Sequence, residues 1–261
     1  MQWHSFVATN SKIFIPMKKV LCFLCLTLVF YSCKKQSNDP YSLPDSYSNQ
    51  GLGKSANDLL SAAKYTTLNI QVQYMPGYAL DPGTIANVTS YLNSICNKPG
   101  GINITQSQIP ASGDTMTPNK VAVLEKQNRT AYTSGNTISL YIMVTDGYDT
   151  SVSILGFSYR NTSICLFGKD IFDHSGGLGE LSRVAMESSV LEHELGHIMG
   201  LVNLGTLMVA PHQDVAHGNH CSNANCLMYY AIESHTGIGM YNDIPALDSN
   251  CVHDLRANGG K

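Results

Sequence analysis

The 261-residue sequence has little charge: Asp, Glu, Lys and Arg together make up 13%, and the formal net charge is −3. It lacks the basic stripe that a nucleic-acid-binding surface needs to neutralise phosphates, so no nucleic acid is expected as a partner. It also lacks internal repeats and an apolar run of about 20 residues, the length that a membrane-spanning helix needs. Hydrophobic residues, at 43%, are sufficient for a globular core.

The first 33 residues resemble an export segment. Met-Lys-Lys at residues 17–19 precedes a short apolar run that ends in Ser-Cys, and Cys33 is the residue that a bacterial lipoprotein would lipidate. We therefore predict an upstream extension and lipoprotein-type signal peptide over residues 1–33, then a flexible polar tether over residues 34–63. The protein would be exported, with a lipid anchor as its only membrane contact, at the periplasmic side or the cell surface. An ordinary signal peptide or an uncleaved anchor is the alternative.

Residues 64–261 are predicted to form a single domain. Alternating or continuous apolar runs predict strands over residues 66–75, 101–109, 137–145, 154–159 and 163–167. Helical spacing predicts helices over residues 82–95, 181–200 and 245–256, and residues 118–132 form a short helix or an irregular connection. This order predicts an α/β (α+β) fold, a twisted mixed sheet against helices, with a loop-rich C-terminal part ending in a helix.

The predicted helix over residues 181–200 carries an HExxH motif, His193-Glu194-Leu195-Gly196-His197. Residues four apart lie one above the other on a helix face, so His193 and His197 can reach one metal ion. Imidazole nitrogen is a preferred ligand of Zn²⁺. Glu194 can approach a metal-activated water and accept its proton as a general base. A structural helix with solvated histidines is the alternative.

The motif and the residues after it, HELGHIMG, resemble the metzincin clan of zinc peptidases, whose pattern is HExxHxxGxxH followed by a methionine turn. Gly200 falls on the family's glycine, where the chain bends and a positive φ is tolerated. The family's third histidine would stand at position 203, which is Asn203 here. An amide oxygen is a poor zinc ligand beside imidazole, so the third ligand must come from elsewhere.

An HCx4CxM stretch begins at His220 and is similar to the segment after the glycine in archaemetzincins. This resemblance implies that residues 203–219, seventeen in all, are inserted between the helix end and the third ligand. His220 would then be the third zinc ligand. Other candidates lie inside the inserted segment: His212, Asp214 and His217.

The resemblance also implies roles for two residues beyond His220. Met228 would be the methionine-turn residue and form an apolar floor under the metal. Tyr230 matches a tyrosine that, in the astacin branch, moves onto the metal and steadies the oxyanion; an ordinary half-buried tyrosine is the alternative. The strand over residues 154–159 would pair with an extended substrate.

Three of the eight cysteines lie in the export segment, which leaves Cys96, Cys165, Cys221, Cys226 and Cys251. An oxidising compartment permits disulfides, and the odd number leaves one thiol free, with Cys165 in an apolar run the best candidate. In archaemetzincins the equivalents of Cys221 and Cys226 join a distal CxxC around a second zinc. Only Cys251 follows here, so a site of four cysteines cannot form. A Cys221–Cys226 disulfide is predicted instead, with Cys96 and Cys251 as the remaining pair, although sequence alone leaves the pairing open.

These features predict a monomeric zinc endopeptidase that hydrolyses peptide bonds of peptide or protein substrates outside the cytoplasm. Its Zn²⁺ would be held by His193, His197 and His220. A second hypothesis is a catalytically inactive, zinc-stabilised surface lipoprotein that binds a partner; Asn203 favours this hypothesis, whereas the intact Glu194 opposes it. A third is a zinc hydrolase that acts on another class of substrate.

Overall fold

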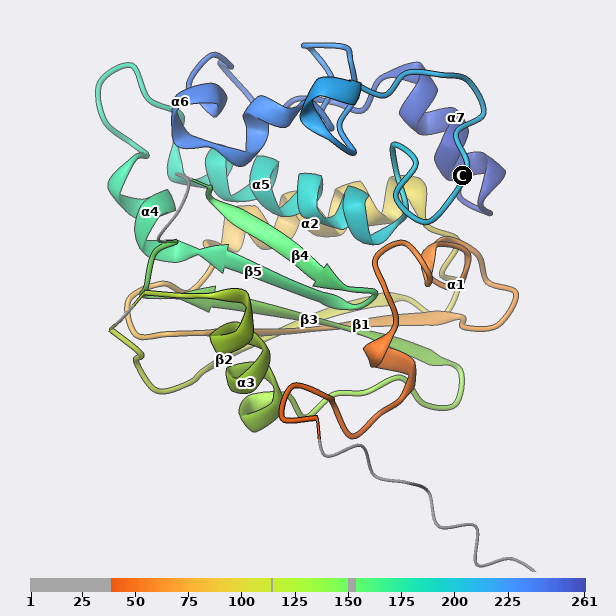
Figure 1. The fold of residues 1–261 in the computed structure, drawn as a ribbon, viewed down its shortest axis with the longest axis horizontal. Helices are drawn as coiled ribbons and strands as arrows, with labels where there is room; N and C mark the ends of the chain where they lie inside the picture. Colours follow the sequence, from red (N-terminus) through yellow and green to blue (C-terminus); the bar gives the residue numbers. More distant parts are fainter. Residues whose placement is uncertain (1–38, 114, 150–153) are drawn as a thin grey trace, which may run out of the picture. The chain divides into compact units, whose positions relative to one another are not determined.

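Five short strands form one twisted mixed sheet (Figure 1). The computed structural model describes residues 39–113, 115–149 and 154–261, and Asp39–Lys261 form one unit. In spatial order β2-β1-β3-β5-β4, the first four strands run parallel and β4 runs antiparallel to β5 at the edge. The predicted fold class is therefore confirmed. The strands are β1 (Thr67–Tyr74), β2 (Ile102–Gln108), β3 (Thr137–Thr145), β4 (Gly156–Arg160) and β5 (Ser163–Phe167).

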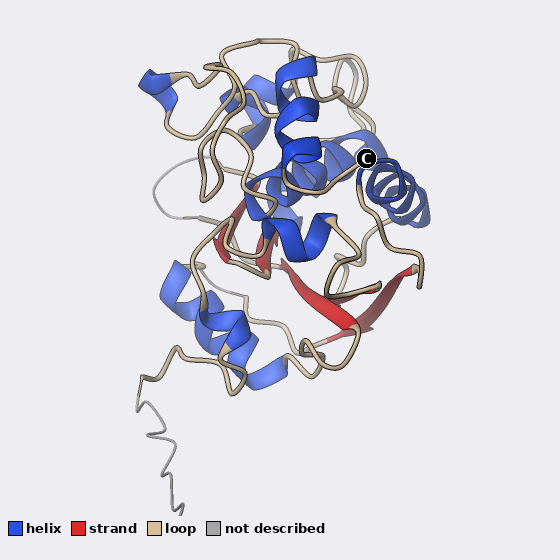
Figure 2. Cartoon of the chain, turned by 90° about the vertical axis from the view of Figure 1, so that its right-hand side faces the viewer, coloured by secondary structure: helices blue, strands red, loops and turns tan. Residues whose placement is uncertain are grey.

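Each face of the sheet has its own apolar core because side chains alternate along a strand. On one face, buried residues such as Ile70 and Ile142 pack against α2 (Pro82–Ile95) and α5 (Arg183–Ile198). On the other face, Tyr141 and Phe167 pack against α3 (Pro118–Asn128). Figures 1 and 2 show the sheet between these helical layers.

Helix α5 is well defined at both ends. Its N-cap Ser182 accepts a hydrogen bond from the Ala185 amide, which satisfies one of the free donors of the first turn. At the other end, the Leu201 amide donates to the Gly196 carbonyl and the Gly200 amide donates to the His197 carbonyl. This is a Schellman motif, with Gly200 at φ +81°. The sharp bend expected at this glycine is confirmed.

The C-terminal region lies over α5 and has little regular structure, as predicted (Figure 1). Its last helix begins at Ser249 rather than near residue 245, because the Asp248 side chain accepts the Cys251 amide as N-cap. The short helix α4 (Gly168–Asp173), directly after β5, was not predicted. The region's elements are η2 (Val215–His217), η3 (Tyr230–Glu233), α6 (His235–Ile238) and α7 (Ser249–Ala257).

The flexible tether predicted over residues 34–63 is wrong from residue 39 onward. This stretch forms η1 (Tyr47–Asn49) and α1 (Ala56–Leu60), and Leu59 and Leu60 are fully buried in the core. Two adjacent leucines on one short helix anchor the polar segment around them. The predicted signal peptide and Cys33 lie outside the described residues. Within the part of the chain that the structure describes, no helix is long and apolar enough to cross a membrane.

Candidate metal centre

Three imidazoles converge on one point beside α5. His193 and His197 come from adjacent turns of the helix, and their Nε2 atoms are 3.1 Å apart. His220 comes from the loop after η2 and stacks on His193 with ring centroids 5.3 Å apart. All three side chains are buried. The structure therefore brings the predicted third ligand to the HExxH motif, although the two are well separated along the chain.

Main-chain carbonyls orient two of these rings. The Nδ1 atom of His193 is 2.7 Å from the Leu227 carbonyl, and that of His220 is 2.6 Å from the His217 carbonyl. A ring that donates through Nδ1 presents the lone pair of Nε2 to the site, as metal-ligating histidines do. The Nδ1 atom of His197 is buried without a hydrogen-bond partner among the described residues.

The arrangement fits a zinc ion. Nitrogens bound tetrahedrally at about 2.0–2.1 Å are roughly 3.3 Å apart, close to the spacing of His193 and His197. The ligand atoms of the three histidines and Glu233 all lie within 4.8 Å of one another. Nitrogen donors with a carboxylate suit zinc, although other transition metals also accept imidazole.

Glu194, the predicted general base, is fully buried next to the histidines. Its Oε2 atom is 2.7 Å from the hydroxyl of Ser158 on β4, whereas its Oε1 atom is buried without a hydrogen-bond partner among the described residues. An unpaired buried carboxylate oxygen is costly, so such atoms in folded proteins call for a functional explanation. Burial and the charge of Glu233 raise the pKa of Glu194 to about 8, while Ser158 opposes the shift.

Glu233 is the residue of this site that sequence reasoning missed. Its Oε1 atom is 3.5 Å from His193 Nε2, 3.4 Å from His197 Nε2 and 3.0 Å from His220 Nε2. No spacing rule connects a glutamate at the end of the short helix η3 to an HExxH helix. Only its position after the HCx4CxM stretch could have suggested it.

Electrostatics couple these groups. Burial opposes ionisation of Glu233, but hydrogen bonds with the three histidines hold its pKa well below the usual range. Burial lowers the pKa of His197 to about 4, and His193 adds to this effect. Burial alone would lower the pKa of His220, but its hydrogen bond to Glu233 raises it. Neutral His197 keeps a lone pair available for a metal.

Met228 lies under the motif, where the methionine-turn residue was predicted. It is fully buried, and a Cβ added to Gly196 would meet its Sδ at 2.3 Å. Because Gly196, between the two helix histidines, has no side chain, Met228 can pack directly against α5. The packing agrees with an apolar floor.

The other candidate ligands lie elsewhere. The Nδ1 atom of His217 is hydrogen-bonded to Asp214 Oδ2 at 2.7 Å, and the ring of His217 stacks on Tyr230 with centroids 3.7 Å apart. The Asn203 amide is 3.4 Å from Gln213. His212 belongs to a second group, with Cys221, Asp248 and Cys251. The role of Tyr230 at the metal stays a prediction.

The predicted Cys221–Cys226 disulfide is not formed, and neither is the Cys96–Cys251 pair. All five cysteines of the described chain are free and buried, including Cys165. Cys226 Sγ instead lies 3.6 Å from Cys251 Sγ. The first turn of α7 brings Cys251 to the loop cysteines, whereas Cys96 caps the far helix α2.

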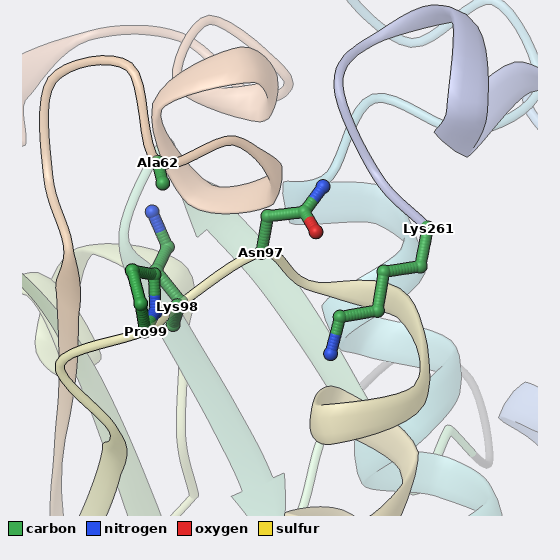
Figure 3. Close-up of a pocket in the computed structure, with 5 residues that line it drawn as sticks. All are labelled: Ala62, Asn97, Lys98, Pro99 and Lys261. Carbon is green, nitrogen blue, oxygen red and sulfur yellow. The ribbon is translucent and has the colours of Figure 1, made fainter.

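The pocket in Figure 3 shares no residue with this centre. It is lined by Ala62, Asn97, Lys98, Pro99 and Lys261. The ammonium of Lys98 donates to the carbonyls of Asp58, Ser61 and Tyr65 at 2.5–2.7 Å. This lysine therefore fastens α1 to the sheet, and its charge is already satisfied.

The chain resembles several solved structures weakly, and two of them illustrate the likeness. Archaemetzincin from Methanopyrus kandleri is 15% identical with a TM-score of 0.46, over 75% of this chain and 96% of that one. Metalloproteinase-II from Bacteroides fragilis is 15% identical with a TM-score of 0.41, over 76% of this chain and only 54% of that one. No protein-family model and no curated protein matches the sequence. Likeness of this degree carries no argument about activity, so function must be argued from the chain's own residues.

Proposed function

We propose that this chain is a zinc-dependent endopeptidase of metzincin type that acts as a monomer outside the cytoplasm. The observation that carries the proposal is Glu194. A metal site that only stabilises a fold needs no further carboxylate, yet Glu194 is buried beside the three histidines with one oxygen unpaired among the described residues. A buried carboxyl group with a raised pKa next to a metal-ligand cluster is typical of a catalytic base.

Each residue then has a distinct role. His193, His197 and His220 would hold the metal. Zinc, when bound, would supply polarisation of the substrate carbonyl and increased acidity of water. Glu194 would accept the proton of the attacking water and return it to the leaving amine nitrogen. Tyr230 would have to leave its stacked position on His217 to reach the oxyanion.

The edge strand β4 supports an extended peptide as the substrate. Its hydrogen-bonding side opposite β5 is not paired with any described strand, because β4 ends the sheet order. Ser158 of this strand contacts Glu194, so a peptide added alongside β4 would run past the catalytic base. Lipid anchoring at Cys33 and export remain parts of the proposal that depend on the sequence alone.

The test uses the full-length chain, solubilised from membranes, with a mixed peptide library and mass spectrometry. We expect cleavage that stops with a zinc chelator and returns with added zinc. Glu194→Gln keeps the side-chain shape but removes the base, so it should lower the rate by at least about 100-fold. Glu180→Gln, at an exposed position, is the matched control. Cleavage by Glu194→Gln at the parent rate would refute the proposal.

Glu233 favours the second hypothesis, a zinc-stabilised protein that binds a partner. With Glu233 the site offers four donors, and a closed four-ligand set is typical of structural zinc, whereas catalytic sites keep one position open. Glu233→Gln separates the two hypotheses. If Glu233 lies beside an open site, the variant keeps bound zinc and peptide cleavage. If Glu233 completes a structural site, the variant loses zinc affinity, and neither protein cleaves peptides.

A further inference from the structure

A second group of metal-ligand side chains lies in the C-terminal region, outside the HExxH site. His212 and Cys221 approach each other at 3.4 Å, between Nδ1 and Sγ. Cys251 Sγ is 3.9 Å from the same nitrogen and 3.6 Å from Cys226 Sγ. All four side chains are buried, and the three thiols are free.

These spacings match the edges of a zinc tetrahedron. With Zn–S near 2.3 Å and Zn–N near 2.0–2.1 Å, sulfur atoms should be roughly 3.8 Å apart, and sulfur and nitrogen roughly 3.5 Å apart. Thiols at a disulfide bond length would be far closer. Each of these three pairs of atoms therefore has the spacing of two ligands on one zinc ion.

The neighbours of these four residues are those that a bound metal requires. His212 Nε2 is 2.9 Å from the buried carboxylate of Asp254, which fixes the ring and leaves Nδ1 to face the sulfurs. Cys226 Sγ accepts the amides of Met228 at 3.4 Å and Asp248 at 3.3 Å. Amides that donate to sulfur stabilise its charged form.

Asp248 also lies within reach, since its Oδ2 accepts a hydrogen bond from Cys221 Sγ at 3.3 Å. Its oxygens, however, have other partners: Oδ1 caps α7 through the Cys251 amide, and Oδ2 accepts from Asn223. Zinc in structural sites prefers thiolate to carboxylate. Cys226 is therefore the better fourth ligand.

We propose that His212, Cys221, Cys226 and Cys251 form a second, structural zinc site, with three thiolate ligands and one imidazole. Its imidazole comes from the inserted segment, residues 203–219, and so gives that segment a function. The site joins three stretches that share little regular structure: the inserted segment, the loop before Met228, and α7. A metal here would supply folding energy where regular structure is sparse. Because Cys221 follows His220, it also fixes the third ligand of the first site.

The experiment measures zinc content and the absorption of the cobalt-substituted full-length protein. The parent should hold about two zinc ions per chain, and the cobalt form should show sulfur-to-cobalt charge-transfer absorption in the near ultraviolet. Since the first site has no sulfur ligand, this absorption reports the second site alone. His212→Ala should remove or sharply weaken it, whereas His253→Ala, at an exposed position of α7, should not.

Further variants cover the case in which His212→Ala does not fold. His212→Cys converts the site to one of four thiolates and should keep the charge-transfer absorption. Cys226→Ser should lose it, while Asp248→Asn should keep it. The HExxH site is tested separately, because a Glu194→Gln variant without activity leaves the sulfur signal intact.

Oxidation is the competing fate of three clustered thiols in an exported protein. Alkylation followed by mass spectrometry should find Cys226 and Cys251 protected in the zinc-loaded protein and labelled after chelation. A Cys226–Cys251 disulfide in the isolated protein, or a parent without sulfur-to-cobalt absorption, overturns the proposal.

Discussion

Ser158 should set the acid limb of the pH–rate profile. Its hydroxyl is 2.7 Å from Glu194 Oε2 and 2.9 Å from the Glu194 carbonyl, so a single proton is shared between two acceptors. A hydrogen bond to a charged group contributes about 1.5–3 kcal/mol, and one pKa unit corresponds to about 1.4 kcal/mol. Because the hydroxyl proton is shared between two acceptors, we expect the lower end of this range, a change of about one unit in the pKa of Glu194.

The direction follows from the protonation state that catalysis uses. Glu194 acts as a base when ionised, so activity is present above its pKa and is lost as the pH falls through it. Hydrogen bonding to Ser158 lowers this pKa, against the larger effect of burial, which raises it. Ser158→Ala should therefore raise the pKa further and move the acid limb of kcat/KM up by about one pH unit.

The assay is kcat/KM for a cleaved peptide from about pH 5 to about 10, with the thermal midpoint recorded at each pH. Ser189→Ala is the matched control, because Ser189 lies on α5 and its hydroxyl is buried without a partner among the described residues. An acid limb that stays in place, or moves to lower pH, would show that Glu194 is not the titrating base. A loss of activity equal at every pH would instead indicate damage to β4.

Three other perturbations follow from the packing. Arg129→Met breaks an ion pair with Glu125 in which both side chains are fully buried, and urea unfolding should show a loss of about 3–5 kcal/mol; an unchanged midpoint would mean that Arg160 alone satisfies Glu125. Gly196→Ala forces Met228 to move: overpacking of about 1–3 kcal/mol should exceed the gain of up to about 1 kcal/mol in helix propensity, with weaker zinc binding by titration. An unaltered zinc affinity in Gly196→Ala would show that the packing of Met228 does not support the metal ligands. Chelation should lower the thermal midpoint of the parent, and a smaller shift in His212→Ala would assign part of that effect to the second site.

The order of strands and helices could be predicted because local patterns of apolar and polar residues determine it. Apolar alternation marks β1, and the nearly continuous apolar run of β3 marks a strand that is buried on both faces. Helix α5 was predictable from its motif and from the glycine that ends it. The tether prediction failed because composition averaged over residues 34–63 concealed Leu59 and Leu60, which decide whether that segment packs.

The candidate site was only partly predictable, for a similar reason. The i, i+4 spacing places His193 and His197 on one helix face by itself, whereas Glu233 and Ser158 reach the site through tertiary packing. No local spacing encodes such contacts. The cysteines show the same limit: the pairs were predicted from a family resemblance and an oxidising compartment, but the first turn of α7 determines which sulfurs meet.

The position of His220 shows why an insertion at this point can be tolerated. The backbone at His220 is held on both sides: the Asp214 amide donates to the His220 carbonyl, and the next residue, Cys221, donates its amide to the Met228 carbonyl. Neither contact involves α5, so neither depends on how many residues separate Asp214 from the end of the helix. The helix must only end sharply at Gly200, and the ligand must only be held by its own neighbours. The metal geometry therefore constrains the end of α5 and the residues from Asp214 onward, and the stretch between them is free to acquire His212 for another purpose.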